Sequence, residues 1–510
     1  MNKQLKNFGF GIQSKQAFAL GLAAIIGLAS VQPSAIAAPP QAKKPQVRAQ
    51  QLSQQARNQQ SRAQQSTRPG MMRIRGFNRE FTPEQYKKLS QVQPLDRDDI
   101  LLVMPNAKAE KDEISDAFEQ AHGEVVAEFG EGEMKILVVK TEHGKALQTQ
   151  QKLVADGHFS AVDFNKREAA DWVQPIYKEP KLADSWHLYR MHCPEVFGGL
   201  FVDPRLKELI AVLDSGLQGS EVSKVGMGAD CTGIYRYLAL KLAVKLMIGD
   251  SVDDNASKVE QWGNLVSYMT YCLDDQNGHG TWVSSSAAGG DNGVASLGIN
   301  PRTAVYPIRI ANGPPGTIYT DELSEVVAMM ICCQSNIRIV NISYGGVPDP
   351  SKKVLQAIMR YYHDKKNGLI FTSAGNKGKN LTYPQASYLE VVSAMEKTDK
   401  GLKLADKSVN GVFDSNYGNC VTFTAPGSVI NCCGADGKPA VVYGTSFASP
   451  IAAGIASLIW GQNRGLKNTD VERIMIQSCE NTTAGRNSKF GYGMPDAKKA
   501  MQIMGVPTND

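Results

Sequence analysis

The sequence predicts an α/β protein with two folded units: a doubly wound parallel sheet over residues 180–508, and a small α+β unit of βαββαβ order over residues 96–172. The first observation behind this is that apolar, mostly β-branched runs alternate with helical segments after residue 180. Continuous apolar runs are typical of strands that are covered on both faces. The second is that shorter strand-like and helix-like segments alternate between residues 96 and 172. Hydrophobic residues make up 42% of the 510 residues and charged residues 21%, which excludes wholesale disorder and a polytopic membrane protein.

Residues 1–37 have the pattern of a secretory signal peptide. Three lysines precede an apolar run from Ala17 to Val31, and Ala35-Ile36-Ala37 forms a small-residue cleavage site. The alternative is a membrane anchor, but an apolar run of this length is shorter than the ~20 residues that span a bilayer. We therefore expect an exported protein, extracellular or periplasmic, with no integral membrane segment once the signal is removed.

Residues 38–95 are predicted to be a Gln-rich basic linker. Residues 41–68 hold ten glutamines and no aromatic residue, so they cannot bury enough apolar surface to fold. Within this range, Thr82-Pro83-Glu84 predicts the start of a short helix that ends near Leu89. Residues 1–73 carry ten lysines and arginines and no acid, so residues 74–510 have a net charge of −5 although the whole chain has +5. The folded part is mildly acidic, and we expect no nucleic-acid partner.

The unit at 96–172 is predicted from its alternating segments. The expected strands are 100–104, 124–129, 134–141 and 159–164, and the expected helices are 110–121 and 144–155. In the large unit, the expected strands are 209–213, 304–308, 337–342, 369–373, 389–394 and 421–424. The expected helices there are 321–334, 352–365 and 447–460. In an open parallel sheet, ligands bind beyond the carboxyl ends of the strands.

The nine cysteines all lie in the last two thirds of the chain, and an exported protein meets conditions in which cysteines form disulfide bonds. We expect at least one such bond, and Cys420 with Cys432 or Cys433 would close a short loop. The alternative is that several cysteines are buried free thiols.

Three polar residues at the ends of apolar runs are candidate catalytic residues. Asp214 follows a buried strand, His279 lies between glycines at a helix start, and Ser446 opens a helix rich in small residues. Each also has a structural explanation: Asp214 and Ser446 as caps, His279 as an exposed loop residue. Together they supply what nucleophilic hydrolysis needs, because serine requires a base and an Asp fixes the tautomer of the imidazole.

Asn376 completes the set of candidate residues. It follows another predicted buried strand and carries a side-chain amide. Its NH2 group and the Ser446 backbone N–H would form an oxyanion hole. Alternatively, Asn376 is a turn residue after Gly375.

At this point the residues resemble the subtilisin-like serine protease (subtilase) family. The motifs are Leu213-Asp214-Ser215-Gly216, Gly278-His279-Gly280-Thr281, Ser373-Ala374-Gly375-Asn376, Asn341-Ile342-Ser343-Tyr344-Gly345-Gly346 and Gly444-Thr445-Ser446-Phe447-Ala448-Ser449-Pro450. The last is the most specific. The resemblance covers about 180–500, and residues 96–172 resemble the inhibitory propeptide of that family.

The resemblance implies an exported serine endopeptidase, made as an autoprocessed zymogen, that works through an acyl-enzyme. Protein or peptide substrates would bind along Ser343, Tyr344, Gly345, Gly346, Ser373, Ala374 and Gly375. The chain's own propeptide would be an intramolecular inhibitor, cut off near residues 165–180. No cofactor or metal is needed for the chemistry. Structural calcium is common in the family, and the loop with Asp291 and Asn292 is a candidate without a decisive ligand set.

Two features depart from the family pattern. Trp282 replaces a second histidine in the histidine motif, from which we expect a reshaped cleft wall. Residues 219–274 are an insertion with a helix expected at 235–248, which would restrict access to the cleft, bind a partner or be a tolerated surface addition. The alternative to an enzyme is a catalytically silent subtilase-like binding module. An esterase would need G-x-S-x-G, and residue 448 is Ala.

Overall fold

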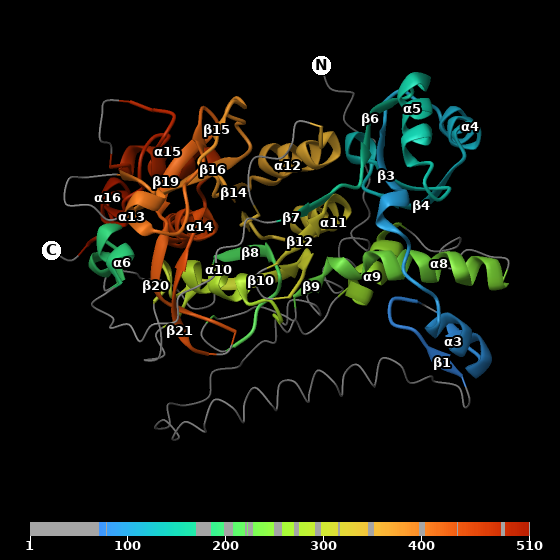
Figure 1. Ribbon diagram of the computed structural model, residues 1–510, viewed down its shortest axis with the longest axis horizontal. Helices are drawn as coiled ribbons and strands as arrows, with labels where there is room; N and C mark the ends of the chain where they lie inside the picture. Colours follow the sequence, from blue (N-terminus) through green and yellow to red (C-terminus); the bar gives the residue numbers. More distant parts are fainter. Residues whose placement is uncertain are drawn as a thin grey trace, which may run out of the picture.

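The computed structural model describes residues 71–508 except 78, 170–184, 198–207, 220–221, 223–227, 249–257, 270–274, 291–296, 315–316, 345–350, 397–402, 436 and 481–484. The expected signal peptide and most of the expected linker lie outside the described residues. Within the described ranges, the chain forms a large α/β unit, a small α+β unit and an N-terminal segment (Figure 1).

The large unit is built on an eight-stranded sheet. Its path runs β17 (Lys403–Leu404), β16 (Glu390–Glu396), β14 (Leu369–Ser373), β13 (Ile339–Ile342), β8 (Leu209–Asp214), β10 (Ala304–Arg309), β9 (Ala229–Asp230), and β19 (Val421–Pro426) pairs with β16. Every pairing except β16 with β17 is parallel. The six expected strands are therefore confirmed. β8 lies between β10 and β13, so its carboxyl end is where a ligand is expected to bind in an open parallel sheet.

Helices cover both faces of this sheet, as a doubly wound fold requires. Along β8, Ile210 and Val212 belong to the core beneath α10 (His279–Ala288) and α14 (Thr445–Gln462), whereas Ala211 and Leu213 belong to the core beneath α11 (Glu322–Gln334) and α12 (Lys353–Lys366). Strands buried on both sides have no polar face, which explains their continuous apolar sequence. α15 (Asn468–Ser478) and α16 (Ala497–Ile503) pack against the outside of α14.

The small unit has the expected βαββαβ order. An antiparallel sheet runs β4 (Gly123–Phe129), β5 (Ile136–Thr141), β3 (Ile100–Pro105), β6 (Phe159–Phe164). Leu101 and Val103 of β3 face α4 (Lys111–Ala121) and α5 (Ala146–Asp156). Ile100, Leu102 and Met104 point the other way and share one core with the large unit. The apolar run of β3 is continuous because both of its faces are covered.

Residues 71–95 fold, which corrects the expectation of a linker as far as residue 95. β1 (Met72–Arg73) pairs with β2 (Glu80–Phe81), and α3 (Pro83–Ser90) follows. Thr82 forms a capping box with Gln85, so the helix start predicted from Thr82-Pro83-Glu84 is confirmed. The sequence has no long run of apolar residues at helical or strand spacing here, because the segment packs its apolar side chains against another part of the chain.

The cysteines differ from expectation. Six of them are buried free thiols, namely Cys193, Cys231, Cys332, Cys333, Cys420 and Cys479. The expected bridge from Cys420 is therefore wrong. Cys420 begins the run into β19 and is 1% exposed, so it packs as a small apolar side chain.

Candidate active site

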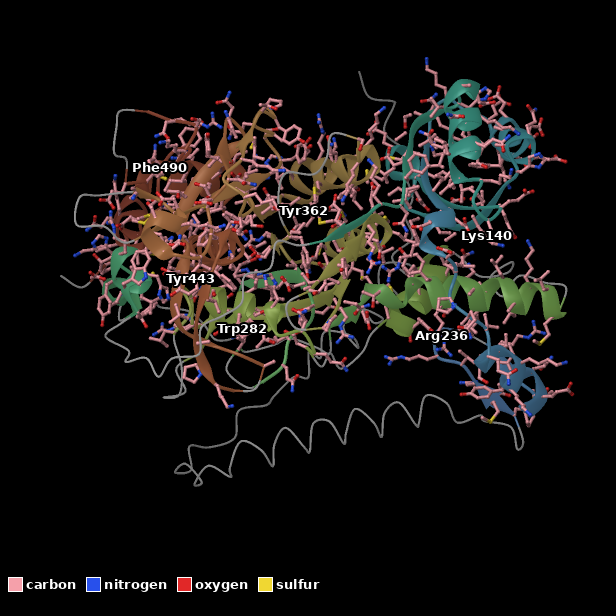
Figure 2. The ribbon with its side chains drawn as sticks, viewed as in Figure 1. Lys140, Arg236, Trp282, Tyr362, Tyr443 and Phe490 are labelled. Atoms are coloured by element: carbon pink, nitrogen blue, oxygen red, sulfur yellow. The ribbon has the colours of Figure 1, made fainter. Side chains whose placement is uncertain are left out.

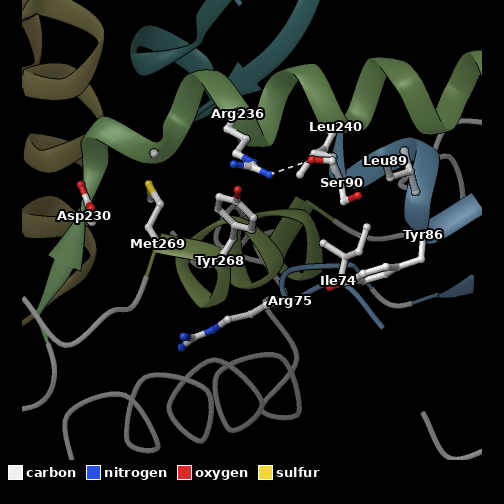
Figure 3. A pocket seen from close by; sticks show the side chains of 11 residues that line it. Ile74, Arg75, Tyr86, Leu89, Ser90, Asp230, Arg236, Leu240, Tyr268 and Met269 are labelled. Carbon is white, nitrogen blue, oxygen red and sulfur yellow. Dashed lines mark hydrogen bonds between the residues drawn. The ribbon is translucent and has the colours of Figure 1, made fainter. Parts of the chain in front are cut away.

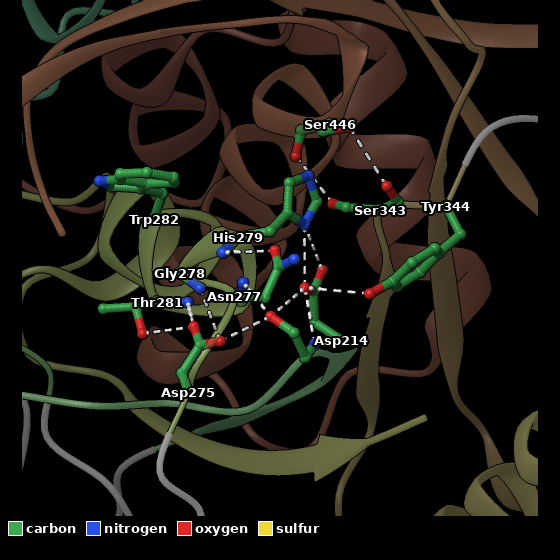
Figure 4. A network of polar contacts seen from close by, with 12 residues as sticks. Asp214, Asp275, Asn277, Gly278, His279, Thr281, Trp282, Ser343, Tyr344 and Ser446 are labelled. Carbon is green, nitrogen blue, oxygen red and sulfur yellow. Dashed lines mark hydrogen bonds and ion pairs between the residues drawn. The ribbon is translucent and has the colours of Figure 1, made fainter. Parts of the chain in front are cut away.

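The fold brings the three candidate catalytic residues together at the carboxyl edge of the large sheet. Asp214 is the last residue of β8, His279 the first of α10 and Ser446 the second of α14. They are 0%, 3% and 5% exposed. Figure 4 shows His279 between Asp214 on one side and Ser446 on the other. Residues that are 65 and 232 positions from Asp214 in sequence thus meet in one place.

Asp214 orients the imidazole of His279. Nδ1 of His279 lies 2.9 Å from Oδ1 and 3.1 Å from Oδ2 of Asp214. The same carboxylate accepts a hydrogen bond of 2.8 Å from the backbone N–H of Ser215. With Nδ1 held by the carboxylate, the ring turns Nε2 toward Ser446 (Figure 4). This is the arrangement of a base and its orienting acid.

Ser446 is held against the end of β13. Its Oγ donates to the carbonyl of Ser343 at 3.2 Å, and the Oγ of Ser343 donates to the carbonyl of Ser446 at 2.7 Å. Pro450 explains the second bond, because a proline has no N–H for the carbonyl four residues earlier in a helix. The carbonyl of Ser446 is thereby available to Ser343.

The start of α10 approaches β8 so closely that residue 280 must be a glycine. A Cβ at Gly280 would lie 2.3 Å from the carbonyl oxygen of Gly216 and 3.1 Å from Cβ of Asp214. The Gly-His-Gly sequence thus reflects packing: the glycine after the histidine lets the helix start reach the carboxylate.

Sequence reasoning missed a second carboxylate behind this pair. Asp275 is 2% exposed and accepts hydrogen bonds from Ser215 Oγ at 2.8 Å, from Gly278 N–H at 2.8 Å and from Thr281 Oγ at 2.7 Å. Ser215 Oγ in turn accepts from Gly280 N–H at 2.9 Å. Asp275 therefore fixes the loop that carries His279. The signal in the sequence was an aspartate four residues before a candidate histidine.

Tyr344, a predicted substrate-binding residue, lies against His279 and Asp214. It is 6% exposed, its ring centroid is 6.0 Å from that of His279, and its hydroxyl donates to Asp214 Oδ1 at 3.3 Å. Burial, with the charge of Asp214 as a second cause, raises the pKa of the Tyr344 phenol well above its ordinary value. The phenol thus stays protonated and remains a donor.

Asn376 lies beside the start of α14. Its Oδ1 accepts from the backbone N–H of Thr445 at 2.8 Å and from the Thr445 hydroxyl at 2.9 Å. Gly444 precedes this turn with φ +132°, and a Cβ there would lie 3.2 Å from Nδ2 of Asn376. The Asn376 amide is thus anchored one residue from Ser446.

The remaining predicted substrate-binding residues are only partly described. Ser373 and Ala374 are fully buried, and Gly375 donates its N–H to the Thr445 hydroxyl at 2.9 Å. Gly345 and Gly346 lie outside the described residues. Trp282 is 5% exposed and belongs to the core beneath α10 and α14.

A strand edge near the site was not predicted from sequence. β11 (Ala311–Asn312) pairs with β12 (Tyr319–Asp321), and β12 takes β7 (Arg167–Ala169) as a third, antiparallel strand. The side-chain amide of Asn277 donates to the carbonyls of Gly313 and Pro314, which ties this hairpin to the loop before His279. An extended piece of the chain thus already occupies an edge that adjoins the site.

Metal-ligand geometry occurs outside the large unit. Among the described residues, Asp96, Asp99 and His143 offer ligand atoms within 4.8 Å of one another, on the small unit. Asp291 and Asn292 lie outside the described residues. In the same described part of the chain, no helix has the length and apolar character to cross a membrane.

Comparisons with known proteins match the large unit. The family model Peptidase_S8, described as the subtilase family, matches residues 207–493. The "Cell wall-associated protease" of Bacillus subtilis (strain 168) is 32% identical over 220 residues, which cover 42% of this chain and 23% of that protein. The "Subtilisin" of Bacillus sp. (strain TA39) is 34% identical over 265 residues, covering 47% of this chain and 62% of that protein. The chain thus spans less than two thirds of the length of these relatives.

Solved structures share the fold. The Epidermin leader peptide processing serine protease (EpiP) from Staphylococcus aureus superposes with a TM-score of 0.56 at 14% identity, covering 80% of this chain and 99% of that one. Fervidolysin from Fervidobacterium pennivorans, a keratinolytic enzyme related to subtilisin, has a TM-score of 0.54 at 18% identity, covering 80% of this chain and 62% of that one.

Proposed function

The chain belongs to the subtilase family, and on that premise we propose that it is an exported serine endopeptidase made as a self-cleaving zymogen. The observation that carries the proposal is the meeting of Asp214, His279 and Ser446, buried at the carboxyl edge of the sheet, with His279 Nδ1 2.9 Å from Asp214. An aspartate, histidine and serine in this spatial order make up a nucleophile, its base and the group that orients the base.

In the proposed reaction, Ser446 Oγ turns from the carbonyl of Ser343 toward Nε2 of His279. Oγ attacks the scissile carbonyl carbon while His279 takes the hydroxyl proton. The tetrahedral intermediate collapses, the C–N bond breaks, and His279 delivers the proton to the leaving amine. Water then attacks the ester with His279 as base, which releases the acid and restores Ser446. Asp214 stabilises the imidazolium both when the acyl-enzyme forms and when water hydrolyses it.

The developing oxyanion would be held by Asn376 Nδ2 and the N–H of Ser446. Two features support this. Oδ1 of Asn376 is bound by Thr445, which fixes the amide, and the Ser446 N–H is at the N-terminal end of α14, where backbone N–H groups lack helical partners.

A peptide substrate would bind as an added strand. β12 already accepts β7 in antiparallel register, with Tyr319 opposite Ala169 and Asp321 opposite Arg167. We propose that the substrate peptide lies between Ser343 and β12. Hydrogen bonds between the backbone of the substrate and the backbone of these strands would supply affinity. β7 then marks where the chain's own segment enters the cleft before it is cut.

Residues 96–172 would be the inhibitory propeptide, which we call the prosegment together with residues 71–95. Its contacts with the large unit support this role. Asp163 accepts from the N–H of Val354 at 2.7 Å, and Asn165 accepts from the N–H of Leu323 at 2.8 Å. N–H groups in the first turn of a helix have no carbonyl partner within that helix, so the small unit caps α12 and α11 of the large unit.

The proposal is tested with a fluorophosphonate probe and a casein-clearing assay on the wild type and on Ser446→Ala. The wild type is expected to label and to clear casein, while Ser446→Ala does neither and accumulates as the longer, uncut chain. A wild type that neither labels nor clears indicates the catalytically silent binding module instead. Equal chain lengths for the two proteins would contradict self-cleavage.

A further inference from the structure

The insertion at 219–274 is covered by the prosegment from two sides. Its two helices, α8 (Ile234–Ile248) and α9 (Lys258–Met269), lie between the small unit and the hairpin-and-helix segment at 71–95 (Figure 1). β4 packs against one side of α8, and α3 packs against another. The segment that we expected to be linker is therefore seated on the insertion whose role the sequence left open.

Aromatic packing makes the first part of this contact. Phe77 is 5% exposed, and its ring lies 5.4 Å from that of Tyr237 on α8, which lies 5.2 Å from that of Tyr268 on α9. Gly76, at φ +80°, passes so close that a Cβ would lie 2.6 Å from Cβ of Tyr268 and 2.8 Å from the carbonyl of Asn264. The segment fits this surface at backbone distance.

Backbone groups make the second part. Arg236 Nη2 of α8 donates to the carbonyl of Ser90 at the end of α3, at 3.3 Å, and Figure 3 shows its side chain directed at that end. Figure 2 shows Arg236 on the side of α8 that faces the 71–95 segment. The N–H of Leu95 donates to the carbonyl of Tyr235 at 3.3 Å. These bonds fix the register of the segment along α8.

Tyr235 joins the two parts of the prosegment. Its hydroxyl accepts from Asn165 Nδ2 at 2.8 Å and donates to Asp321, the N-cap of α11, and the guanidinium of Arg97 lies over its ring at 5.3 Å. One residue of α8 thus contacts the 71–95 segment through its backbone and the small unit through its side chain.

A pocket lies at the edge of this contact. A cavity of about 410 Å³ remains between the two partners (Figure 3). Ile74, Tyr86 and Leu89 line it from the segment, and Leu240 and Met269 line it from the insertion.

From these contacts we propose that α8 and α9 are a docking surface for residues 71–95, and that they hold the prosegment on the enzyme after it has been cut. This inference rests on the proposed function, because it concerns how the prosegment is kept over the proposed active site. The small unit on α11 and α12 is one attachment, and the segment on α8 and α9 is the second. Two linked attachments raise the retention of a ligand by 10²–10⁴ over either alone, so removing the second one releases the prosegment.

The test separates this inference from the protease proposal. The full chain is made as Ser446→Ala with the recognition sequence of a site-specific protease placed between residues 172 and 180. It is cut with that protease, and prosegment remaining with residues 185–510 is followed by size-exclusion chromatography after dilution. Cleavage then does not depend on the chain's own activity.

The cut parent is expected to keep its prosegment. Phe77→Ala removes the ring that packs against Tyr237, and is expected to raise the dissociation rate of the prosegment at least tenfold (~1.4 kcal/mol). Arg236→Met, at an exposed position, keeps the stem of the side chain and removes the bond to Ser90, with a smaller increase of about threefold. Leu147→Ala is the matched control: it truncates a side chain of α5 that is 60% exposed, and should leave the rate unchanged.

Thermal unfolding of each uncut chain shows whether a variant has folded. If Phe77→Ala does not fold, Arg236→Met decides the question alone. A parent that loses its prosegment as soon as it is cut overturns the proposal, and so do dissociation rates of Phe77→Ala and Arg236→Met equal to that of the parent.

Discussion

Replacing Tyr344 by Phe removes one atom from the network around Asp214. The Tyr344 hydroxyl donates to Asp214 Oδ1 at 3.3 Å, beside the bonds from His279 Nδ1 and Ser215 N–H. The ring itself stays in place against His279, since phenylalanine keeps its shape. The change therefore alters how the negative charge of Asp214 is shared, and not the packing of the site.

The magnitude follows from the kind of bond that is lost. Hydrogen bonds to a charged group contribute about 1.5–3 kcal/mol, and a length of 3.3 Å places this one at the weak end. A loss of about 1.4 kcal/mol is tenfold in kcat/KM. The kcat/KM of Tyr344→Phe is therefore expected to fall by as much as ~10-fold, because Asp214 loses one of the donors that hold it in place beside His279.

The assay is the kcat/KM for a chromogenic peptide, measured at one fixed pH for all variants. Tyr388→Phe is the matched control, because its hydroxyl also makes a 3.3 Å hydrogen bond, to the neutral Gln356, away from the triad. The control should have the same kcat/KM as the wild type. A kcat/KM of Tyr344→Phe equal to that of the wild type would refute the reasoning.

Two further predictions concern packing and pH. Gly280→Ala places a methyl group 2.3 Å from the carbonyl oxygen of Gly216, so α10 must move and kcat/KM should fall by at least ~10²-fold. Gly461→Ala is the control, because a methyl group there meets open space and kcat/KM should match the wild type. Equal kcat/KM values for the two variants would contradict the packing argument. Burial raises the pKa of Glu322 to about 9 from its ordinary 4.5, and a carboxyl whose pKa is raised on folding contributes stability below its unfolded pKa that is lost as the pH rises. The uncut Ser446→Ala chain should thus lose stability from about pH 5 to 9, by up to ~1.4 kcal/mol per pH unit, as measured by thermal unfolding. Glu322→Gln should flatten this dependence, and an equally steep slope in that variant would show that the group does not titrate there.

The secondary structure could be predicted because each element leaves a local pattern. β8 and β14 are buried on both faces, so their sequences are continuously apolar, and α14 carries small residues where it packs on the sheet. The candidate catalytic residues were found for a related reason, since each interrupts such a pattern at the end of an element. The glycine after His279 is visible in the sequence, although the 2.3 Å approach that requires it is not.

The sequence by itself determined the order of the strands and helices and the residues at their ends, because burial and backbone preferences act over neighbouring positions. Only the tertiary structure decided that Tyr344 reaches Asp214, that β7 lies on β12, that Cys420 stays a thiol and that residues 71–95 fold on α8 and α9. Each of these depends on atoms that are far apart along the chain. Such contacts form when whole elements pack, and no local sequence pattern records which partners will meet.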